Sequence, residues 1–264
     1  MKKYVVIGNP IEHSLSPKLH GYWFKKYGID AIYEKVQVLD AELEQVISKI
    51  KKGEINGANV TVPHKSKVIK YLDALSEDAE KTQSVNTIYR KEGKIYGANT
   101  DTVGFEQSLF EKHINIKNKQ ILILGAGGVT PSIICVLQKL KASKILISNR
   151  TKDDAEKLKE KFTNIDVVNW GETPSADFVI NTTSVGLRSN DFINIDYDKI
   201  GTNKFYYDVI YKPSKTNFLR EAEKRGNKIE NGKLMFIYQA QKAFEIWHNT
   251  KPEVNREVEE LLDD

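Results

Sequence analysis

The sequence predicts an α/β protein built from two domains. Its 264 residues exceed the ~150 typical of a single domain, and 40% of them are hydrophobic, which is enough for two separate cores. After Gln120, short apolar strands alternate with helices, a pattern typical of a parallel sheet covered on both faces. The first hundred residues instead mix strands, helices and a hairpin. We therefore expect an N-terminal α/β domain followed by a doubly wound α/β domain.

In the first hundred residues, short runs rich in β-branched and aromatic residues predict strands at 4–7, 31–38 and 58–62. Apolar side chains recur at helical spacing from residue 39 to residue 50, with Asp40 as a plausible N-cap. Val68, Leu72 and Leu75 suggest a second helical face. A hairpin is predicted over residues 87–97, with Glu92-Gly93 in its turn.

In the rest of the chain, continuous apolar runs predict buried strands at 121–124, 144–148, 177–181 and 205–209. Helices are expected between and after these strands, at 129–140, 153–162 and 234–248. The last of these helices is mostly apolar and carries small residues, so we expect it to pack between domains.

Composition and charge exclude several classes of protein. The 40 Lys and Arg residues nearly balance the 36 Asp and Glu residues, so the net charge of +4 gives no sign of a nucleic-acid partner. The single cysteine, Cys135, excludes a disulfide framework and a cysteine-based zinc site, and the histidines lack metal-ligand spacing. No apolar run reaches the ~18 residues of a membrane span, and Asn9-Pro10 interrupts the first one too early for a signal peptide. We expect a cytoplasmic protein, monomeric or homodimeric, that uses no metal, nucleic acid or membrane.

A glycine-rich turn is the strongest local motif. Gly125-Ala126-Gly127-Gly128 follows the strand at 121–124, and with Thr130 it makes a G-x-G-x-x-small pattern before a helix. Such glycines allow a tight turn and let a pyrophosphate approach backbone N–H groups at the positive end of the helix. Pro131 is tolerated only in the first helical turn and so limits where the helix begins. The motif predicts a Rossmann-type dinucleotide-binding domain.

The end of the next strand distinguishes NADP from NAD. An NAD site expects an acidic residue there for the ribose 2′-OH, and a 2′-phosphate would repel that carboxylate. This sequence has Asn149-Arg150-Thr151 instead, and Arg150 offers a fork of donors that suits a phosphate. The alternative is a solvated basic loop. NADP is the cofactor that we expect.

Three polar segments follow predicted strands in the first domain. Ser14 and Ser16 could cap the following helix or hold a substrate carboxylate. Thr61 ends a strand, and Lys65 lies in the loop after it, where a lysine is usually a solvated surface charge. Asn99-Thr100-Asp101 follows the hairpin and alone predicts only a turn.

Taken together, these motifs resemble the shikimate dehydrogenase family over nearly the whole chain. The segments that carry the resemblance stand in family order, as follows: Gly8-Asn9-Pro10-Ile11, Ser14-Leu15-Ser16-Pro17, Asn59-Val60-Thr61-Val62-Pro63-His64-Lys65, Val85-Asn86-Thr87, Asn99-Thr100-Asp101, Gly125-Ala126-Gly127-Gly128, Asn149-Arg150-Thr151, Asn181-Thr182-Thr183-Ser184-Val185-Gly186, Asp208-Val209-Ile210-Tyr211-Lys212-Pro213 and Met235-Phe236-Ile237-Tyr238-Gln239-Ala240. Each segment alone is a weak pattern, but their order and spacing together are specific.

The resemblance implies reversible NADPH-dependent reduction of 3-dehydroshikimate to shikimate, a step of aromatic amino-acid biosynthesis. It implies a substrate domain over residues 1–101 and 239–264, and an NADP domain over 102–238, with the reaction in a cleft between them. Ser14 and Ser16 would bind the substrate carboxylate, and Lys65 and Asp101 would act at the reacting oxygen.

The remaining implied contacts divide between substrate and cofactor. Those with the substrate are Thr61, Asn86 and Gln239 on the ring hydroxyls, with Tyr211 near both the substrate and the nicotinamide. Those with the cofactor are the turn Gly125-Ala126-Gly127-Gly128, then Asn149, Arg150 and Thr151 on the ribose phosphate, and Gly232 and Met235 at the nicotinamide.

Two positions depart from the family pattern. Gly232 is followed by Lys233-Leu234-Met235, where the family usually has Leu-Gly-Met, so Leu234 replaces a glycine beside the nicotinamide. Thr130-Pro131 replaces the usual small pair after the glycine turn. Both departures bear on cofactor affinity and leave Lys65 and Asp101 untouched.

Two alternative functions remain at this point. One is a quinate/shikimate dehydrogenase paralogue that tolerates NAD or takes another cyclohexane acid, against which Arg150 and the two serines argue. The other is a non-catalytic NADP-binding sensor, which would need neither Lys65 nor Asp101.

Overall fold

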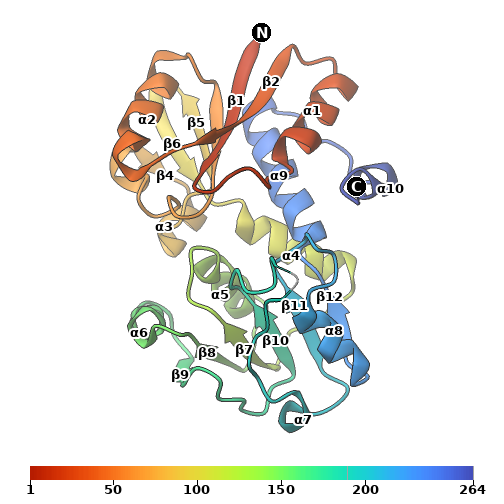
Figure 1. The fold of residues 1–264 in the computed structure, drawn as a ribbon. Coiled ribbons are helices and arrows are strands. Elements are labelled where there is room, and N and C mark those ends of the chain that lie inside the picture. The colour runs from red at the N-terminus through yellow and green to blue at the C-terminus, as the bar shows by residue number, and fades with distance from the viewer. Residues whose placement is uncertain (189, 264) are drawn as a thin grey trace. The chain divides into compact units, whose positions relative to one another are not determined.

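The computed structural model describes residues 1–188 and 190–263. Two compact units make up the chain (Figure 1): the first comprises Met1–Gln107 and Ile237–Asp264, and the second comprises Ser108–Phe236. The boundaries fall within α4 (Asp101–Glu111) and α9 (Lys233–His248). Among the described residues, no helix combines the length and the apolar character needed to cross a membrane.

The first unit holds a six-stranded mixed sheet, whose strands in spatial order are β2 (Ala31–Gln37), β1 (Lys2–Gly8), β3 (Gly57–Val60), β5 (Thr87–Lys91), β6 (Lys94–Ala98) and β4 (Ala74–Leu75). β1 pairs in parallel with β2 and β3, whereas β5 runs antiparallel to both β3 and β6, as the predicted hairpin requires. The helices of this unit, besides α4 and α9, are α1 (Ser16–Lys26), α2 (Leu43–Lys52), α3 (Glu77–Thr82) and α10 (Arg256–Glu260).

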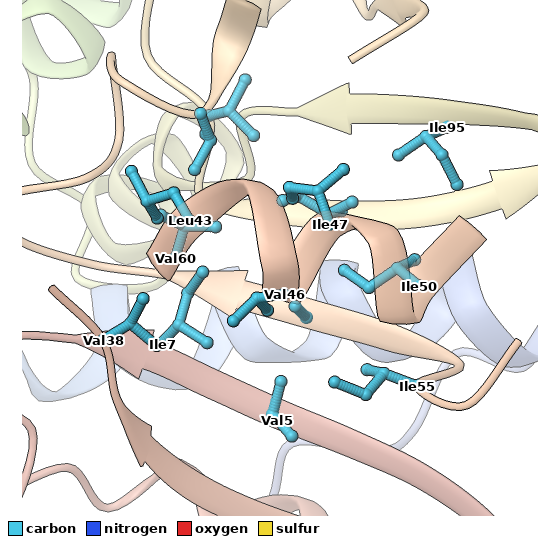
Figure 2. Packing of buried hydrophobic residues seen from close by; sticks show 14 of the residues in the cluster. Val5, Ile7, Val38, Leu43, Val46, Ile47, Ile50, Ile55, Val60 and Ile95 are labelled. Atoms are coloured by element: carbon cyan, nitrogen blue, oxygen red, sulfur yellow. The ribbon is translucent and has the colours of Figure 1, made fainter. Parts of the chain in front are cut away.

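The apolar face of α2 packs on this sheet, as its helical spacing predicts (Figure 2). Leu43, Ile47 and Ile50 are at most 1% exposed, and they share a cluster with Val5 and Ile7 of β1. Each side chain of this kind contributes roughly 1.5–3 kcal/mol when fully buried. This cluster therefore supports one face of the strands that lead to the polar segments described above.

Two predictions in this unit were wrong. Asp40 is not an N-cap: it lies inside a short 3₁₀ turn, Asp40–Glu42, and its carboxylate pairs with Lys67 instead. Residues 68–75 do not form a helix, because they divide into a 3₁₀ turn, Ile69–Tyr71, and the short strand β4. Backbone hydrogen bonds from Asp73 and Ser76 to β6 hold this segment extended, so tertiary pairing overrides the helical spacing.

The C-terminal segment contributes aromatic side chains to the core of the first unit. On α9, Phe244 lies 5.6 Å from Trp23 of α1, and Trp247 lies 4.9 Å from Tyr4 of β1, measured between ring centroids. The Trp247 indole also donates a hydrogen bond of 3.1 Å to the carbonyl oxygen of Ile88. The end of the chain is thus an integral part of the N-terminal unit.

The second unit holds a six-stranded sheet that is parallel throughout, whose strands in spatial order are β12 (Lys228–Glu230), β11 (Phe205–Asp208), β10 (Phe178–Asn181), β7 (Gln120–Leu124), β8 (Lys144–Ser148) and β9 (Ile165–Val168). The first strand, β7, lies at the centre of the sheet. The strands β8 and β9 are added on one side of it and β10, β11 and β12 on the other, so the strand order reverses between β7 and β10, as in a Rossmann-type sheet. Ligands of such sheets bind at the carboxyl ends of the strands beside this reversal. The predicted doubly wound fold is confirmed.

The helices of the second unit, besides its parts of α4 and α9, are α5 (Thr130–Lys139), α6 (Lys152–Lys161), α7 (Tyr197–Ile200) and α8 (Asn217–Lys224). α5 follows β7, and Pro131 stands in its first turn, as the sequence predicts. This placement puts the glycine-rich segment between the end of β7 and the start of α5.

Candidate active site

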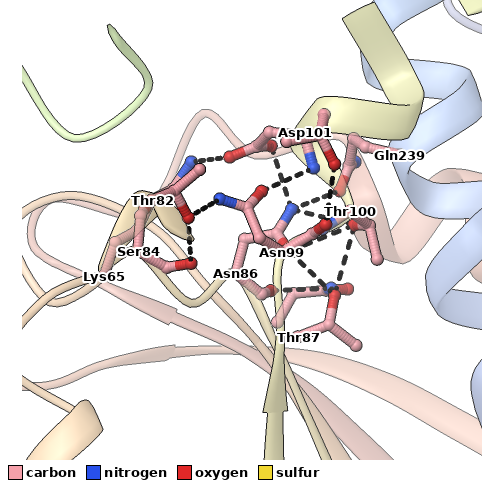
Figure 3. Close-up of polar contacts among 11 residues, drawn as sticks. Lys65, Thr82, Ser84, Asn86, Thr87, Asn99, Thr100, Asp101 and Gln239 are labelled. Atoms are coloured by element: carbon pink, nitrogen blue, oxygen red, sulfur yellow. Dashed lines mark hydrogen bonds and ion pairs between the residues drawn. The ribbon is translucent and has the colours of Figure 1, made fainter. Parts of the chain in front are cut away.

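Lys65, Asn86 and Asp101, which we refer to as the lysine cluster, meet in the first unit (Figure 3). The Lys65 ammonium lies 2.5 Å from Asp101 Oδ2, and Asn86 Nδ2 donates to Asp101 Oδ1 at 2.9 Å. The side chains of Lys65 and Asp101 are only 12% and 8% exposed. From the sequence alone, Lys65 is typical of a solvated surface charge, but the structure buries most of its side chain against a carboxylate.

Local structure fixes each member of the lysine cluster. Lys65 follows β3, and its carbonyl oxygen accepts a hydrogen bond from the Val85 N–H at 2.8 Å. Asn86 Oδ1 accepts from the Thr100 N–H at 2.7 Å, which orients the amide. Asp101 is the first residue of α4, where the helix dipole favours a negative charge.

Gln239 joins the same cluster from α9 (Figure 3). Its Oε1 accepts a weak hydrogen bond of 3.4 Å from Asn86 Nδ2. The cluster thus presents a cation, a carboxylate and amide groups side by side. A cation held in this way can stabilise negative charge that develops on a substrate oxygen and can also supply a proton to it.

Ser14 and Ser16, the serine pair, lie at the start of α1. Ser14 Oγ donates to Ser16 Oγ at 3.2 Å and accepts from the Ser16 N–H at 3.3 Å. The N-cap position of α1 is Leu15, which has no side-chain acceptor. The helix-cap interpretation therefore accounts for one backbone bond only, and it leaves the adjacent hydroxyls as a candidate anion site.

Thr61 follows β3 directly and is half-buried. A Cβ at Gly8 would lie 2.4 Å from Thr61 Cγ2, so the glycine allows the end of β1 to approach this residue closely. Thr61 and Lys65 are thus both placed by the segment after β3, as the sequence suggests.

The glycine turn of the second unit has the geometry of a phosphate cradle. Gly125 has a φ of +111°, which favours glycine, and a Cβ there would lie 2.7 Å from Thr182 Oγ1. The Ala126 N–H donates to Asn149 Oδ1 at 3.1 Å, while Gly127 and Gly128 are exposed. The turn, the following helix and the strand reversal fit a dinucleotide pyrophosphate.

The Thr130 departure has a local explanation. The side chain is fully buried, and its hydroxyl lies 2.8 Å from Thr182 Oγ1 and 3.3 Å from the Gly125 carbonyl oxygen. Thr130 therefore stabilises the inner side of the turn and leaves the exposed glycines uncovered.

Asn149, Arg150 and Thr151 stand immediately after β8, as expected for residues that contact an adenosine ribose. Asn149 Nδ2 donates to the Thr151 carbonyl oxygen at 2.7 Å, which tightens this segment. Arg150 and Thr151 are exposed, so their side chains are accessible to a ligand.

Gly232 is required by a close approach of backbone segments. Its N–H donates to the Ile210 carbonyl oxygen at 3.1 Å, and a Cβ at this position would lie 2.1 Å from the Val209 carbonyl oxygen. Tyr211, next in that segment, stacks on Phe236 at a ring-centroid distance of 4.5 Å. Leu234 and Met235 are both 5% exposed, so Leu234 is a buried side chain here.

Asp208, at the end of β11, holds the Tyr211 segment in place. Its carboxylate is fully buried and accepts from Thr216 Oγ1 at 2.6 Å, the Ile210 N–H at 3.0 Å and Asn181 Nδ2 at 3.0 Å. Burial raises the pKa of Asp208 to about 6, although these three hydrogen bonds oppose the change.

This raised pKa predicts a pH-dependent stability. The folded state holds the Asp208 proton more tightly than the unfolded chain, so the contribution of Asp208 to stability is fully present below pH 4 and is lost as pH rises through about 6. Relative to Asp208→Asn, the unfolding free energy of the unaltered protein is expected to fall by up to about 3 kcal/mol over this range. Urea denaturation of both proteins at several pH values measures the difference. A difference independent of pH would contradict the assignment to Asp208.

Several residues that shape the site received no role from the sequence. Asn59, Thr87 and Thr100 are at most 6% exposed and form a hydrogen-bonded network around Asn86. Asn99 Oδ1 accepts from the Asp101 N–H at 3.0 Å, and Asp208 acts similarly in the second unit. In the sequence, the feature that could have identified these residues is a polar side chain within or directly after a predicted buried strand.

Comparisons with known proteins agree along the whole chain. The family model described as the shikimate dehydrogenase substrate binding domain matches residues 6–88, and that described as shikimate / quinate 5-dehydrogenase matches residues 107–187. A protein of Pelagibacter ubique named shikimate dehydrogenase (NADP(+)) is 56% identical over 262 residues, covering 99% of both chains.

Solved structures give the same result. The shikimate dehydrogenase of Aquifex aeolicus has a TM-score of 0.90 and 36% identity, covering 100% of this chain and 98% of that one. The shikimate 5-dehydrogenase of Thermus thermophilus, solved with NADP(H) and shikimate, has a TM-score of 0.90 and 30% identity, covering 99% of this chain and 98% of that one.

Proposed function

The chain belongs to the shikimate dehydrogenase family, and on this premise we propose that it catalyses the reversible reduction of 3-dehydroshikimate to shikimate with NADPH. The observation that supports this function most directly is the lysine cluster, in which a mostly buried ammonium lies 2.5 Å from Asp101. The test is NADPH oxidation by the purified protein in the presence of 3-dehydroshikimate. Absence of turnover would contradict the proposed function.

Lys65 and Asp101 act at the reacting oxygen. When bound, NADPH supplies the hydride that reduces the substrate ketone. The Lys65 ammonium stabilises the negative charge that develops on the ketone oxygen and donates the proton that completes the alcohol. Asp101 holds the ammonium in position through its 2.5 Å contact, and Asn86 holds Asp101 through its other oxygen.

The other substrate groups bind and orient the ring. The serine pair binds the carboxylate through two hydroxyl donors, and Thr61, Asn86 and Gln239 contact the ring hydroxyls. An analogue that lacks a hydroxyl would lose a hydrogen bond to these groups, so the site is expected to bind it more weakly. We also propose that Tyr211 contacts the substrate and the nicotinamide.

We assign the first unit to substrate and the second to NADP. The glycine turn cradles the pyrophosphate, Asn149, Arg150 and Thr151 bind the ribose 2′-phosphate, and Gly232 and Met235 contact the nicotinamide. The exposed position of Arg150 after β8 supports this assignment, as does the match of residues 6–88 to a substrate binding domain. We also propose that the enzyme works in the cytoplasm as a monomer or a homodimer.

Replacing Arg150 by alanine is expected to raise the KM for NADPH and leave that for NADH unchanged. A hydrogen bond to a charged group contributes about 1.5–3 kcal/mol, which corresponds to a change of roughly 10- to 100-fold. Steady-state kinetics with each cofactor measures the change. Lys152→Ala is the matched control, because Lys152 is an exposed cation two residues away. An equal loss with NADH would contradict the role of Arg150.

The two alternatives are not favoured by the site. A non-catalytic sensor would not require the mostly buried contact between Lys65 and Asp101. One of the matching family models is named for both shikimate and quinate. A quinate-type paralogue therefore differs from a shikimate dehydrogenase in its preferred substrate. Comparing kcat/KM for 3-dehydroshikimate and 3-dehydroquinate tests this point, and the first is expected to be the preferred substrate.

A further inference from the structure

Two buried polar residues connect the end of α3 to Asp101. Thr82 is the last residue of α3 and Asn99 directly follows β6, and their exposed fractions are 1% and 3%. The proposed function assigns neither of them a contact with substrate or cofactor. Both nevertheless belong to the hydrogen-bonded network around the lysine cluster (Figure 3).

The Asn99 side chain makes this connection through both ends of its amide. Its Nδ2 donates to Thr82 Oγ1 at 2.8 Å, and its Oδ1 accepts from the Asp101 N–H at 3.0 Å. If the amide were turned over, its nitrogen would face the Asp101 N–H, and two donors cannot share a hydrogen bond. The amide therefore has one orientation in which both contacts form.

Thr82 is itself held by the last turn of α3. Its hydroxyl donates to the Asp78 carbonyl oxygen at 2.6 Å, and its second carbonyl contact, with Ser84, is longer at 3.3 Å. Because the hydroxyl hydrogen is used in this way, the lone pairs of Oγ1 accept the hydrogen of Asn99. Thr82 thus provides Asn99 with an acceptor at a fixed place.

The chain that follows α3 also contacts the lysine cluster directly. The Val85 N–H donates to the Lys65 carbonyl oxygen at 2.8 Å, and Asn86 Nδ2 donates to Asp101 Oδ1 at 2.9 Å. The same short segment, residues 82–86, therefore supports both members of the ion pair.

We propose that Thr82 and Asn99 are positioning residues that hold Asp101 where its carboxylate meets the Lys65 ammonium. Asp101 is the first residue of α4, and Asn99 supplies the acceptor that the backbone N–H at a helix start lacks. The inference rests on the proposed function, because the place of Asp101 affects the rate only if Lys65 acts at the reacting oxygen. A misplacement of about 1 Å can cost ~10²-fold in rate.

Thr82→Val and Thr82→Ser form a matched pair of variants. Valine keeps the shape of threonine and removes the hydroxyl, so the Asn99 amide loses this partner, whereas serine keeps the hydroxyl and removes a methyl group. Thr82→Val is expected to lower kcat for 3-dehydroshikimate reduction about tenfold and to change the KM for NADPH less than about twofold. The kcat of Thr82→Ser is expected to stay within about twofold of the unaltered protein. Equal losses in the two variants would contradict a role of the hydroxyl.

Ser108→Ala is the control for a general loosening of α4. Ser108 is fully buried on this helix, and its hydroxyl lies 3.0 Å from the Tyr207 hydroxyl. The variant removes a buried polar contact that does not involve Asp101, so its kcat is expected to change less than about twofold. A tenfold loss in this variant would attribute the effect of Thr82→Val to the helix as a whole and overturn the inference.

Amide hydrogen exchange, followed by NMR, reports on the position of Asp101 without turnover. The Asp101 N–H is bonded to Asn99, whereas the Gly104 N–H, later in α4, donates to the Thr100 carbonyl oxygen at 2.9 Å. Thr82→Val is expected to speed exchange at Asp101 about tenfold and to leave exchange at Gly104 unchanged. Equal increases at the two amides would indicate fraying of the helix and would count against positioning.

A double-mutant cycle tests whether Thr82 acts through Asp101. If it does, adding Thr82→Val to Asp101→Asn is expected to lower kcat by less than about twofold beyond the loss in Asp101→Asn alone. A further tenfold loss would show that Thr82 acts elsewhere and would overturn the inference.

If Thr82→Val does not fold, Asn99→Ser breaks the same contact from the other side. A serine hydroxyl still reaches the N–H two residues later but is too short to reach Thr82 as well. An Asn99→Ser protein with unchanged kcat and unchanged exchange at Asp101 would overturn the inference. An unaltered protein that oxidises no NADPH, but whose Asp101 exchange depends on Thr82 as expected, would support the positioning pair and contradict the proposed function.

Discussion

Replacing Lys65 by alanine is expected to lower kcat for 3-dehydroshikimate reduction by ~10²–10⁴-fold, the range typical of a lost general acid. The variant removes both the proton donor and the cation nearest the developing charge, which act mainly in the transition state. The KM for the substrate should therefore change much less than kcat. Steady-state NADPH oxidation measures both constants.

The control is Lys67→Ala in the same loop. Lys67 is exposed and pairs with Asp40 at the surface, where an ion pair contributes at most about 1 kcal/mol. Its removal is expected to change kcat less than twofold. Equal rates for Lys65→Ala and the unaltered protein would exclude the assigned role of Lys65, and equal losses in both lysine variants would attribute the effect to the loop.

Replacing Gly232 by alanine is expected to lower the melting temperature and the affinity for NADPH together. The added Cβ would lie 2.1 Å from a backbone oxygen of Val209, so the chain must move instead of a flexible side chain. Overpacking of this kind costs about 3 kcal/mol, or roughly 6–12 °C in a protein of this size. The movement of the backbone also displaces Ile210, whose carbonyl oxygen accepts the hydrogen bond from the Gly232 N–H, next to Tyr211.

Gly21→Ala is the matched control for this prediction. Gly21 lies within α1, and nothing surrounds its Cβ position within 4 Å, so alanine is expected to stabilise the helix by about 0.5–1 kcal/mol. Thermal denaturation and NADPH titration of the two variants give the comparison. A Gly232→Ala protein that melts like the unaltered chain would show that the backbone segments can separate without cost.

The sequence predicts the fold well where local pattern and tertiary structure agree. The strands around the glycine turn are confirmed, because each is a continuous apolar run between two parallel neighbours. The prediction of a helix over residues 68–75 was wrong for the opposite reason. Their apolar spacing suits a helix, but hydrogen bonds to β6 determine their conformation.

The candidate site divides in a similar way. Lys65, Asp101 and Asn86 could be proposed from family motifs, and the structure brings them together. The supporting side chains could not, since a buried Tyr33 or Asn59 acquires meaning only from its partner on a neighbouring strand. Sequence spacing carries no information about which strands become neighbours across a mixed sheet.

The division of the chain into units has a consequence for protein synthesis. The second unit is one uninterrupted segment, Ser108–Phe236, whereas the first needs Ile237–Asp264 to complete it. Phe244 and Trp247, which pack on Trp23 and Tyr4, leave the ribosome after the whole second unit. The second unit can therefore fold before Phe244 and Trp247 are available to complete the core of the first unit. For this enzyme, the unit that starts first on the ribosome is the one that finishes last.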